Sequence, residues 1–242
     1  MNLTNHKILI TGGSSGIGLA MARRLKALGN HIIITGRNRA KLEEAGQKYD
    51  LDIFQCDLAE NEDILALVKA TKNQHPDLNI LINNAGIQYN YSFEEGVPFE
   101  MIDHEIGVNL NAALKLCSAF IPILSGKQES AIVNVSSGLG ISPKRSAPVY
   151  CATKAGLHIF SKALRYQLES TSIKVFEVIP PLVDTPMTVG RGKDKISPED
   201  LVEEFISGLE KNRYEMNIGK VKLLKMMHRI SPAIADSILK NN

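Results

Sequence analysis

The segment Lys7-Ile8-Leu9-Ile10-Thr11-Gly12-Gly13-Ser14-Ser15-Gly16-Ile17-Gly18 decides the fold of this chain. Its first residues form a continuously apolar run, which is typical of a strand covered on both faces. The glycines let the backbone reverse, and a segment of helical period begins near Ile17. A strand, a glycine-rich turn and a helix N-terminus together favour phosphate binding, because free N–H groups point at the anion. The spacing is T-G-x-x-x-G-x-G rather than G-x-G-x-x-G, since Met21 stands where the third glycine would be.

The rest of the chain repeats this alternation of short apolar runs and longer helical segments. The helical segments are long enough for the crossovers that parallel strands require. We therefore predict an α/β fold, a doubly wound (Rossmann) and mostly parallel sheet of six to seven strands with helices on both faces. The predicted strands are 7–11, 31–35, 52–56, 80–83, 131–135 and 174–179, with a seventh within 214–224. The predicted helices are 17–28, 39–49, 61–74, 100–124 and 150–169.

After the sixth predicted strand the pattern changes at Pro180-Pro181. A polar loop follows and ends at Ser197-Pro198-Glu199-Asp200, which carries the residues of a helix start. We predict a helix from there to about Lys211, and a mobile substrate lid over about 186–211. A C-terminal tail over about 225–242 is interrupted by Pro232. With no repeat or linker in the pattern, 1–242 is expected to be a single domain.

The composition gives no indication of a macromolecular partner. The chain has 242 residues, with 28 Lys and Arg against 26 Asp and Glu, so its net charge is only +2. This balance argues against nucleic acid as a partner. Cys56, Cys117 and Cys151 are an odd number and lack metal-ligand spacing, so we expect neither a disulfide framework nor a metal.

The start of the chain predicts a cytoplasmic protein. No hydrophobic segment precedes the first predicted strand, as a signal peptide would require. The most membrane-like run, 108–123, carries Asn109, Asn111, Lys115 and Pro122 and is shorter than a span of about 20 residues. It is predicted to be a buried helix.

The glycine-rich turn also fits a hydrolase motif. Gly12-Gly13-Ser14-Ser15-Gly16 matches G-x-S-x-G, in which a serine nucleophile lies between a strand and a helix. Such a site needs a sheet built before it and a histidine with an acidic partner, whereas this turn follows the first strand. Serine hydrolysis is therefore a remote alternative, and a glycine turn that binds no ligand also stays open.

Further motifs follow the later predicted strands. Asn83-Asn84-Ala85-Gly86 follows the fourth strand, Asn109 lies in the next helix, Ser136-Ser137 follows the fifth strand, and Tyr150-Cys-Ala-Thr-Lys154 opens a helix. Together with the glycine turn, they make the chain resemble the short-chain dehydrogenase/reductase family, in its single-domain branch. In wording it is most similar to bacterial oxidoreductases encoded beside lipoteichoic-acid D-alanylation genes.

Tyr150 and Lys154 are four residues apart and would share one helix face. A tyrosine pKa near 10 is high for proton exchange at neutral pH, and a neighbouring ammonium group stabilises the phenolate. The resemblance implies that Tyr150 exchanges the proton, that Lys154 also holds the nicotinamide ribose, and that Ser137 binds the substrate oxygen. It assigns a proton relay to Asn109. Ser136 and Asn111 are the neighbouring alternatives.

The resemblance also implies a nicotinamide cofactor and its contacts. The implied cofactor-binding residues are Gly12, Ser14, Ser15, Gly16, Ile17, Gly18, Arg37, Asp57, Leu58, Asn84, Ala85, Gly86, Tyr150, Lys154, Val183 and Thr185. On local grounds Asp57 could instead cap the helix near Asn61. Pro181 stands where the family usually has glycine, so the nicotinamide end of the cofactor could be held differently.

The end of the second strand predicts which nicotinamide cofactor is used. An acidic residue there would bind the ribose 2′-hydroxyl of NAD, whereas arginine pairs with the 2′-phosphate of NADP. The chain has Gly36 at that position and Arg37 next to it. NADP is therefore expected and NAD is disfavoured, unless Arg37 is only a solvated loop residue.

These observations predict an NADP-dependent oxidoreductase that interconverts a carbonyl and an alcohol on a small molecule. The alternative is a catalytically silent nucleotide-binding sensor or scaffold. The resemblance implies a homodimer or homotetramer that pairs through helices such as 100–124 and 150–169. The apolar and basic tail from Lys220 to Leu239 could instead contact a membrane, which we consider less favoured.

Overall fold

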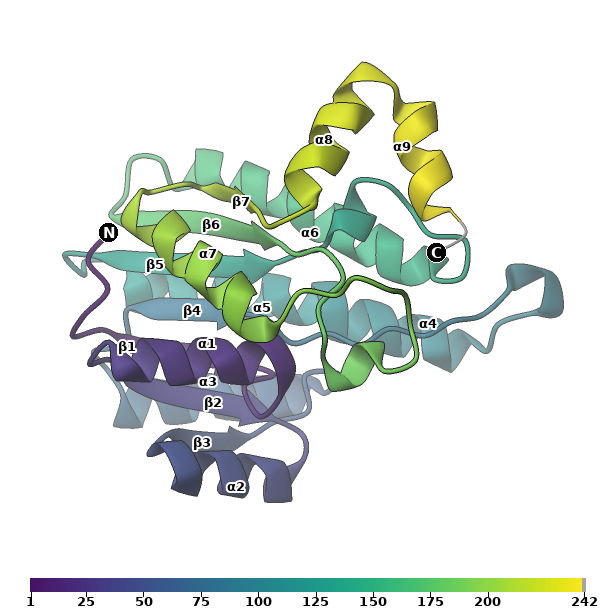
Figure 1. The fold of residues 1–242 in the computed structure, drawn as a ribbon. Helices are drawn as coiled ribbons and strands as arrows, with labels where there is room; N and C mark the ends of the chain where they lie inside the picture. The colour runs from purple at the N-terminus through teal and green to yellow at the C-terminus, as the bar shows by residue number, and fades with distance from the viewer. Residues whose placement is uncertain (241–242) are drawn as a thin grey trace.

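The structure is a computed structural model that describes residues 1–240. Seven strands form one sheet in the order β3-β2-β1-β4-β5-β6-β7, and every neighbouring pair is parallel (Figure 1). The strands are β1 (Lys7–Thr11), β2 (His31–Gly36), β3 (Asp52–Gln55), β4 (Ile80–Asn83), β5 (Ser130–Val135), β6 (Ile173–Ile179) and β7 (Glu215–Asn217). The predicted α/β fold is confirmed.

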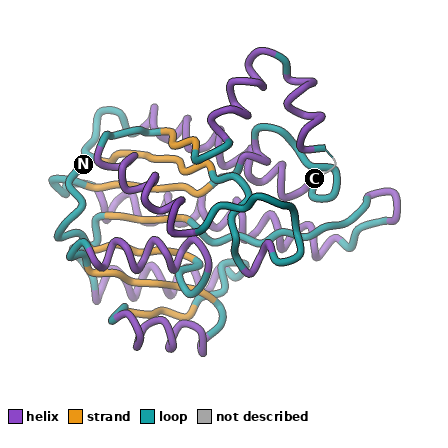
Figure 2. Tube along the Cα trace, viewed as in Figure 1, coloured by secondary structure: helices purple, strands orange, loops and turns teal. Residues whose placement is uncertain are grey.

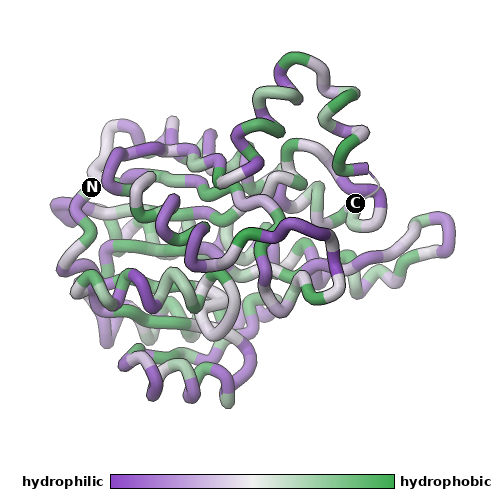
Figure 3. The backbone as a smooth tube through the Cα atoms, viewed as in Figure 1, coloured by the Kyte–Doolittle hydropathy of each residue, from purple (hydrophilic) through white to green (hydrophobic). Residues whose placement is uncertain are grey.

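Helices cover both faces of the sheet, which explains why the central strands β1, β2 and β4 are apolar and buried along most of their length (Figure 3). The helices are α1 (Gly16–Ala27), α2 (Arg39–Tyr49), α3 (Asn61–Gln74), α4 (Phe99–Ile106), α5 (Ala112–Leu124), α6 (Pro148–Gln167), α7 (Pro198–Glu210), α8 (Val221–Ile230) and α9 (Pro232–Leu239). Ile8 and Ile10 of β1 pack into a core with α1, α2 and α7, whereas Leu9 packs into a second core with α3, α5 and α6.

The order of the strands determines where a ligand can bind. The chain runs from β1 outward through β2 to β3, and then returns to the other side of β1 as β4. The loops after β1 and β4 therefore separate at the carboxyl ends of these strands, where doubly wound sheets bind their ligands. In Figure 2 these loops lie on one side of the sheet.

The helix predicted over 100–124 is interrupted by a different hydrogen-bonding pattern. A π-helical segment, Gly107–Asn111, connects α4 to α5. The combined helix Phe99–Leu124 is long and apolar enough to cross a membrane by length and composition. In the fold α5 packs against α3 and the sheet with Leu116, Phe120 and Leu124 in the core, so the predicted buried helix is confirmed.

The seventh strand is much shorter than the predicted region 214–224. Gly219 adopts a positive φ of +50° just after β7, and this turns the chain away from the sheet. Val221 and Leu224 follow with helical spacing and lie against Gly138. Residues 221–224 thus belong to α8, which forms a hairpin with α9 beyond the sheet (Figure 1). Pro232 begins α9 and separates the two helices, as its position predicts.

The segment predicted as a lid has two structurally different parts. Residues 186–197 contain a short turn and an irregular loop, while α7 packs against α1 with Leu201 and Phe205 fully buried. Ser197 caps α7 by accepting a hydrogen bond from the Asp200 N–H. Closure of this segment over a ligand stays a prediction.

Candidate active site

A cavity of about 440 Å³ opens at the carboxyl ends of the central strands. It brings together segments from the glycine turn, the ends of β2 and β3, the loop after β4, α6 and the loop after β6. The predicted site residues on its wall are Gly12, Ser14, Ser15, Gly16, Ile17, Arg37, Asp57, Leu58, Asn84, Ala85, Gly86, Tyr150, Lys154 and Thr185. The other four, Gly18, Asn109, Ser137 and Val183, are not on this wall.

The glycine turn has the geometry of an anion site. Gly12 and Gly16 have φ of +64° and +54°, which disfavour any side chain. Ser15 precedes α1 as its N-cap, but its side chain makes no capping hydrogen bond. The N–H groups of the first turn of α1 are therefore available to a phosphate. Gly18 instead permits close packing, since a Cβ there would lie 2.4 Å from the Gly12 carbonyl oxygen.

Thr11 ties the glycine turn to the loop after β4, a contact that sequence motifs did not indicate. Its hydroxyl accepts hydrogen bonds from the backbone N–H groups of Asn84 and Ala85, both at 3.0 Å. The Asn84 amide in turn donates to the Thr11 carbonyl at 2.9 Å. The Asn84 side chain therefore holds the two loops together, and Asn84 also lines the cavity.

The end of β2 presents two cations. Arg37 is exposed and lines the cavity, and Lys41 of α2, which sequence reasoning missed, lines it as well. Asn38 places this turn by accepting a hydrogen bond from the Lys41 N–H at 3.0 Å. Arg39 is engaged elsewhere, because it donates to Glu43 at 2.6 Å.

The end of β3 contributes Asp57 and Leu58 to the wall. The Asp57 carboxylate accepts a hydrogen bond from the Ala59 N–H at 3.0 Å, so it closes its own turn. Helix α3 begins after Glu60, and the alternative role of Asp57 as its cap is wrong.

Tyr150 and Lys154 lie on one face of α6, which begins with Pro148 in its first turn. The Lys154 ammonium is buried, donates to the Val135 carbonyl at 2.9 Å and lies 5.7 Å from the Tyr150 ring centre. Burial lowers the pKa of Lys154 to about 8, against the opposing charge of Glu177. Burial raises the pKa of Tyr150 to about 12, and a hydrogen bond with Ser137 opposes this. Desolvation thus dominates the pKa of Tyr150 in this structure.

The structure distinguishes each predicted polar residue from its neighbour. Ser137 is hydrogen-bonded with Tyr150, whereas Ser136 donates to the buried carboxylate of Glu177 at 2.5 Å. Asn109 is buried, and its amide donates to the Ile87 carbonyl and accepts from the Ile87 N–H, both at 2.8 Å. Asn111 is exposed. Ser137 is therefore the serine that contacts Tyr150, whereas Ser136 is the one that lines the cavity, and Asn109 is the asparagine that holds the loop at Ile87.

Gly86 lies where Asn109 and Lys154 meet. A Cβ on this glycine would be 3.4 Å from the Asn109 side-chain oxygen and 3.5 Å from the Lys154 nitrogen. The glycine thus lets the loop after β4 approach both side chains.

A buried carboxylate lies behind this group and was not indicated by any motif. Glu177 of β6 is 1% exposed and contacts the His158 ring nitrogen Nδ1 at 2.8 Å. His158 follows Lys154 by one turn of α6, so Tyr150, Lys154 and His158 share one helix face. The one signal in the sequence was the apolar strand around Glu177, because a carboxylate within a buried strand needs a partner.

The loop after β6 covers the glycine turn. The Thr185 methyl group would lie 3.2 Å from a Cβ on Gly16. Val183 is buried, and its carbonyl accepts a hydrogen bond from the Thr188 hydroxyl. The Pro180 carbonyl accepts a hydrogen bond from the Gly138 N–H at 3.0 Å. Pro181 lies beside Gly219. A Cβ on Gly219 would be 3.7 Å from the Pro181 ring.

The serine-hydrolase alternative receives no support from the histidines. The Ser14 hydroxyl lies close to Gly36. His158 has an acidic partner in Glu177, but neither His158 nor His104, which is hydrogen-bonded with Tyr89 at 2.7 Å, lies on the cavity wall that holds Ser14.

The short chain dehydrogenase family profile matches residues 6–196. The chain belongs to this family. Short-chain dehydrogenases are NAD(P)-binding oxidoreductases, so the chain is a dehydrogenase/reductase with a small-molecule substrate. The family resemblance predicted from the motifs is confirmed.

Relatives support this membership along nearly the whole chain. An uncharacterized oxidoreductase of Bacillus subtilis, DltE, is 43% identical over 93% of this chain and 92% of its own length. A 3-ketoacyl-(acyl-carrier-protein) reductase of Brucella melitensis, solved with NADH, has a TM-score of 0.79 at 28% identity, covering 86% of this chain and 91% of its own. A short-chain dehydrogenase of Burkholderia cenocepacia, solved with NADP, has a TM-score of 0.88 over 100% of both chains. At 22% identity this last similarity shows the fold alone.

Proposed function

We propose that this dehydrogenase uses NADP to interconvert a carbonyl and an alcohol on a small molecule, with Tyr150 as proton donor and acceptor. The observation that carries the proposal is the convergence of Ser137, Tyr150 and Lys154 beside a cavity that begins at a phosphate-binding turn. Because Ser137, Tyr150 and Lys154 are all present, a catalytically silent nucleotide sensor is disfavoured.

The residues divide the proton chemistry among them. The bound nicotinamide supplies or accepts the hydride. Ser137 orients the substrate oxygen toward Tyr150, whose hydroxyl gives a proton to that oxygen in reduction and takes it back in oxidation. Lys154, whose ammonium lies 5.7 Å from the centre of the Tyr150 ring, would stabilise the phenolate while the proton is away. Asn109 holds the loop after β4 through two hydrogen bonds to the Ile87 backbone, and this loop lies beside Lys154.

The charges at the end of β2 support NADP rather than NAD. Arg37 and Lys41 offer two cations, and Gly36 leaves no carboxylate at the position that would repel a 2′-phosphate. Both side chains come from the same wall of the cavity as the glycine turn.

Titration of the purified protein with NADPH and NADH, followed by nicotinamide fluorescence, tests the proposal. We expect tighter binding of NADPH. Arg37→Ala should weaken NADPH binding by at least about tenfold while changing NADH binding little, since one charge-assisted contact contributes about 1.5–3 kcal/mol. Arg39→Ala is the matched control, because Arg39 pairs with Glu43. Equal affinities in the wild-type protein would contradict the cofactor preference.

A further inference from the structure

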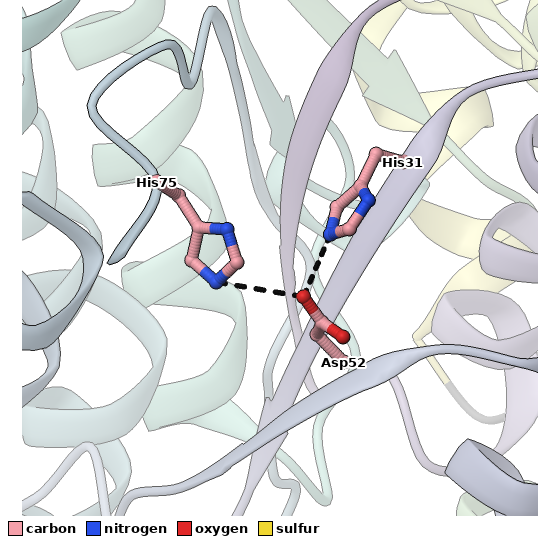
Figure 4. Close-up of side chains that lie close together, drawn as sticks. All are labelled: His31, Asp52 and His75. Atoms are coloured by element: carbon pink, nitrogen blue, oxygen red, sulfur yellow. Dashed lines mark hydrogen bonds and ion pairs between the residues drawn. The ribbon is translucent and has the colours of Figure 1, made fainter.

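A cluster of two histidines and one aspartate lies at the amino ends of the strands, whereas the cofactor cavity lies at their carboxyl ends. His31 is the first residue of β2, Asp52 is the first residue of β3, and His75 follows the end of α3. The three side chains point toward one another around one carboxylate oxygen (Figure 4). One ligand atom from each residue lies within 4.8 Å of the other two.

The two histidines contact Asp52 differently. His31 Nε2 lies 2.6 Å from Asp52 Oδ2, which is a short hydrogen bond. His75 Nε2 lies 3.5 Å from the same oxygen, at the limit of hydrogen bonding, and within the described residues its buried Nδ1 has no hydrogen-bond partner. The His75 side chain is only 14% exposed, so its Nε2 is held on the side of the ring that faces Asp52.

The spacing suits a metal ion between the ligand atoms. Metal bonds of about 2.0–2.1 Å in a tetrahedral arrangement place two ligand atoms about 3.3 Å apart. The separation of His75 Nε2 and Asp52 Oδ2 is already close to this value. His31 Nε2 would have to move away by about 0.7 Å, and its side chain is 47% exposed and free to turn.

The charges around the cluster leave Asp52 available to a cation. Lys7 is paired with Asp77 at 2.7 Å, and Lys26 is paired with Asp50 at 2.7 Å. The neighbouring cations are thus neutralised, and the carboxylate of Asp52 supplies the net negative charge.

We propose that His31, Asp52 and His75 form a binding site for a divalent transition metal such as Zn²⁺. Imidazole and carboxylate ligands suit this class of ion, and three protein ligands leave a fourth position for water. The metal would join the starts of β2 and β3 to the end of α3. Because β3 is a short strand at the edge of the sheet, the bound ion stabilises that edge.

Isothermal titration of tag-free protein with ZnCl₂ tests the site. We expect one Zn²⁺ per chain, at least about tenfold weaker binding in His75→Gln and in His31→Gln, and unchanged binding in His228→Gln, whose histidine lies on α8. Zn²⁺ should also raise the melting temperature of the wild-type protein and not that of His75→Gln. A melting temperature of His75→Gln close to the wild-type value without metal shows that this variant is folded.

Co²⁺ identifies the ligands by absorption. The proposal requires a visible cobalt spectrum without a thiolate charge-transfer band, because Cys56, Cys117 and Cys151 are buried elsewhere. A thiolate band, Zn²⁺ affinity that is unchanged in both histidine variants, or no Zn²⁺ binding by the wild-type protein would overturn the proposal. Neither readout depends on oxidoreductase activity, so this test is independent of the proposed function.

Discussion

At the scale of single residues, the hydroxyl of Tyr150 is the atom on which the proposed chemistry depends. Tyr150→Phe removes this hydroxyl and keeps the ring beside Lys154. We expect turnover to fall by at least about 10²-fold, as the loss of a general acid predicts, with little change in NADPH affinity. Steady-state rates and fluorescence titration measure the two effects separately. Turnover at the wild-type rate would remove Tyr150 from the mechanism.

The buried carboxylate of Glu177 influences the neighbouring Lys154 electrostatically. Its charge raises the pKa of Lys154 and so opposes the effect of burial, which by itself lowers the pKa. In Glu177→Gln the pKa of Lys154 should fall below its value of about 8, and the alkaline loss of activity should move to lower pH, because the ammonium then loses its proton earlier. The variant should also be less stable, by about 1–3 kcal/mol, since His158 and Ser136 lose their charged partner.

The pH profile of kcat separates this electrostatic effect from simple destabilisation. Glu169→Gln is the matched control, because Glu169 is exposed near the end of α6. A Glu177→Gln profile that has lower activity but the same pH limits would show that Glu177 only supports the fold.

At the scale of elements, the close approach of α1 to the loop after β4 depends on Gly18. A Cβ there would lie 2.4 Å from the Gly12 carbonyl oxygen and 2.5 Å from the Asn84 amide nitrogen. We expect Gly18→Ala to destabilise the protein by about 1–3 kcal/mol and to weaken nucleotide binding, because the helix N-terminus must shift. Denaturant unfolding and NADPH titration measure both consequences.

Gly107→Ala provides the comparison, since nothing lies within 4 Å of a Cβ at that helical position. This control should be neutral or slightly stabilising. Equal effects of the two substitutions would show that helix propensity, and not close packing, determines the outcome.

At the scale of the whole molecule, the outer face of α6 presents apolar side chains to solvent. Ile159 and Tyr166 are seven residues apart on that helix and are 62% and 61% exposed. We expect this face to pair two chains, so that Ile159→Glu shifts the protein to a smaller species in light scattering after size exclusion. Leu65→Glu on α3, where Leu65 is 67% exposed, should leave the assembly unchanged. A monomeric wild-type protein would contradict this prediction.

The sequence by itself determined the sheet and much of the site. Continuous apolar runs predict doubly covered strands from local pattern alone, and these matched β1 to β6 within one residue at each end. The spacing of Tyr150 and Lys154 on one helix likewise fixes which face they share. Gly12 and Gly16 were readable because a positive φ restricts the residue type.

Only the tertiary structure decided which distant residues meet. Lys41 reaches the cavity beside Arg37, Thr11 holds the loop at Asn84, and Glu177 lies behind Lys154. The apolar run after β7 became a helix because Gly219 turned the chain, and Gly138 offered a surface for Val221. The cluster around Asp52 also joins residues far apart in the sequence. Such contacts depend on how strands and helices pack in space, whereas periodicity and residue spacing report only on neighbours along the chain.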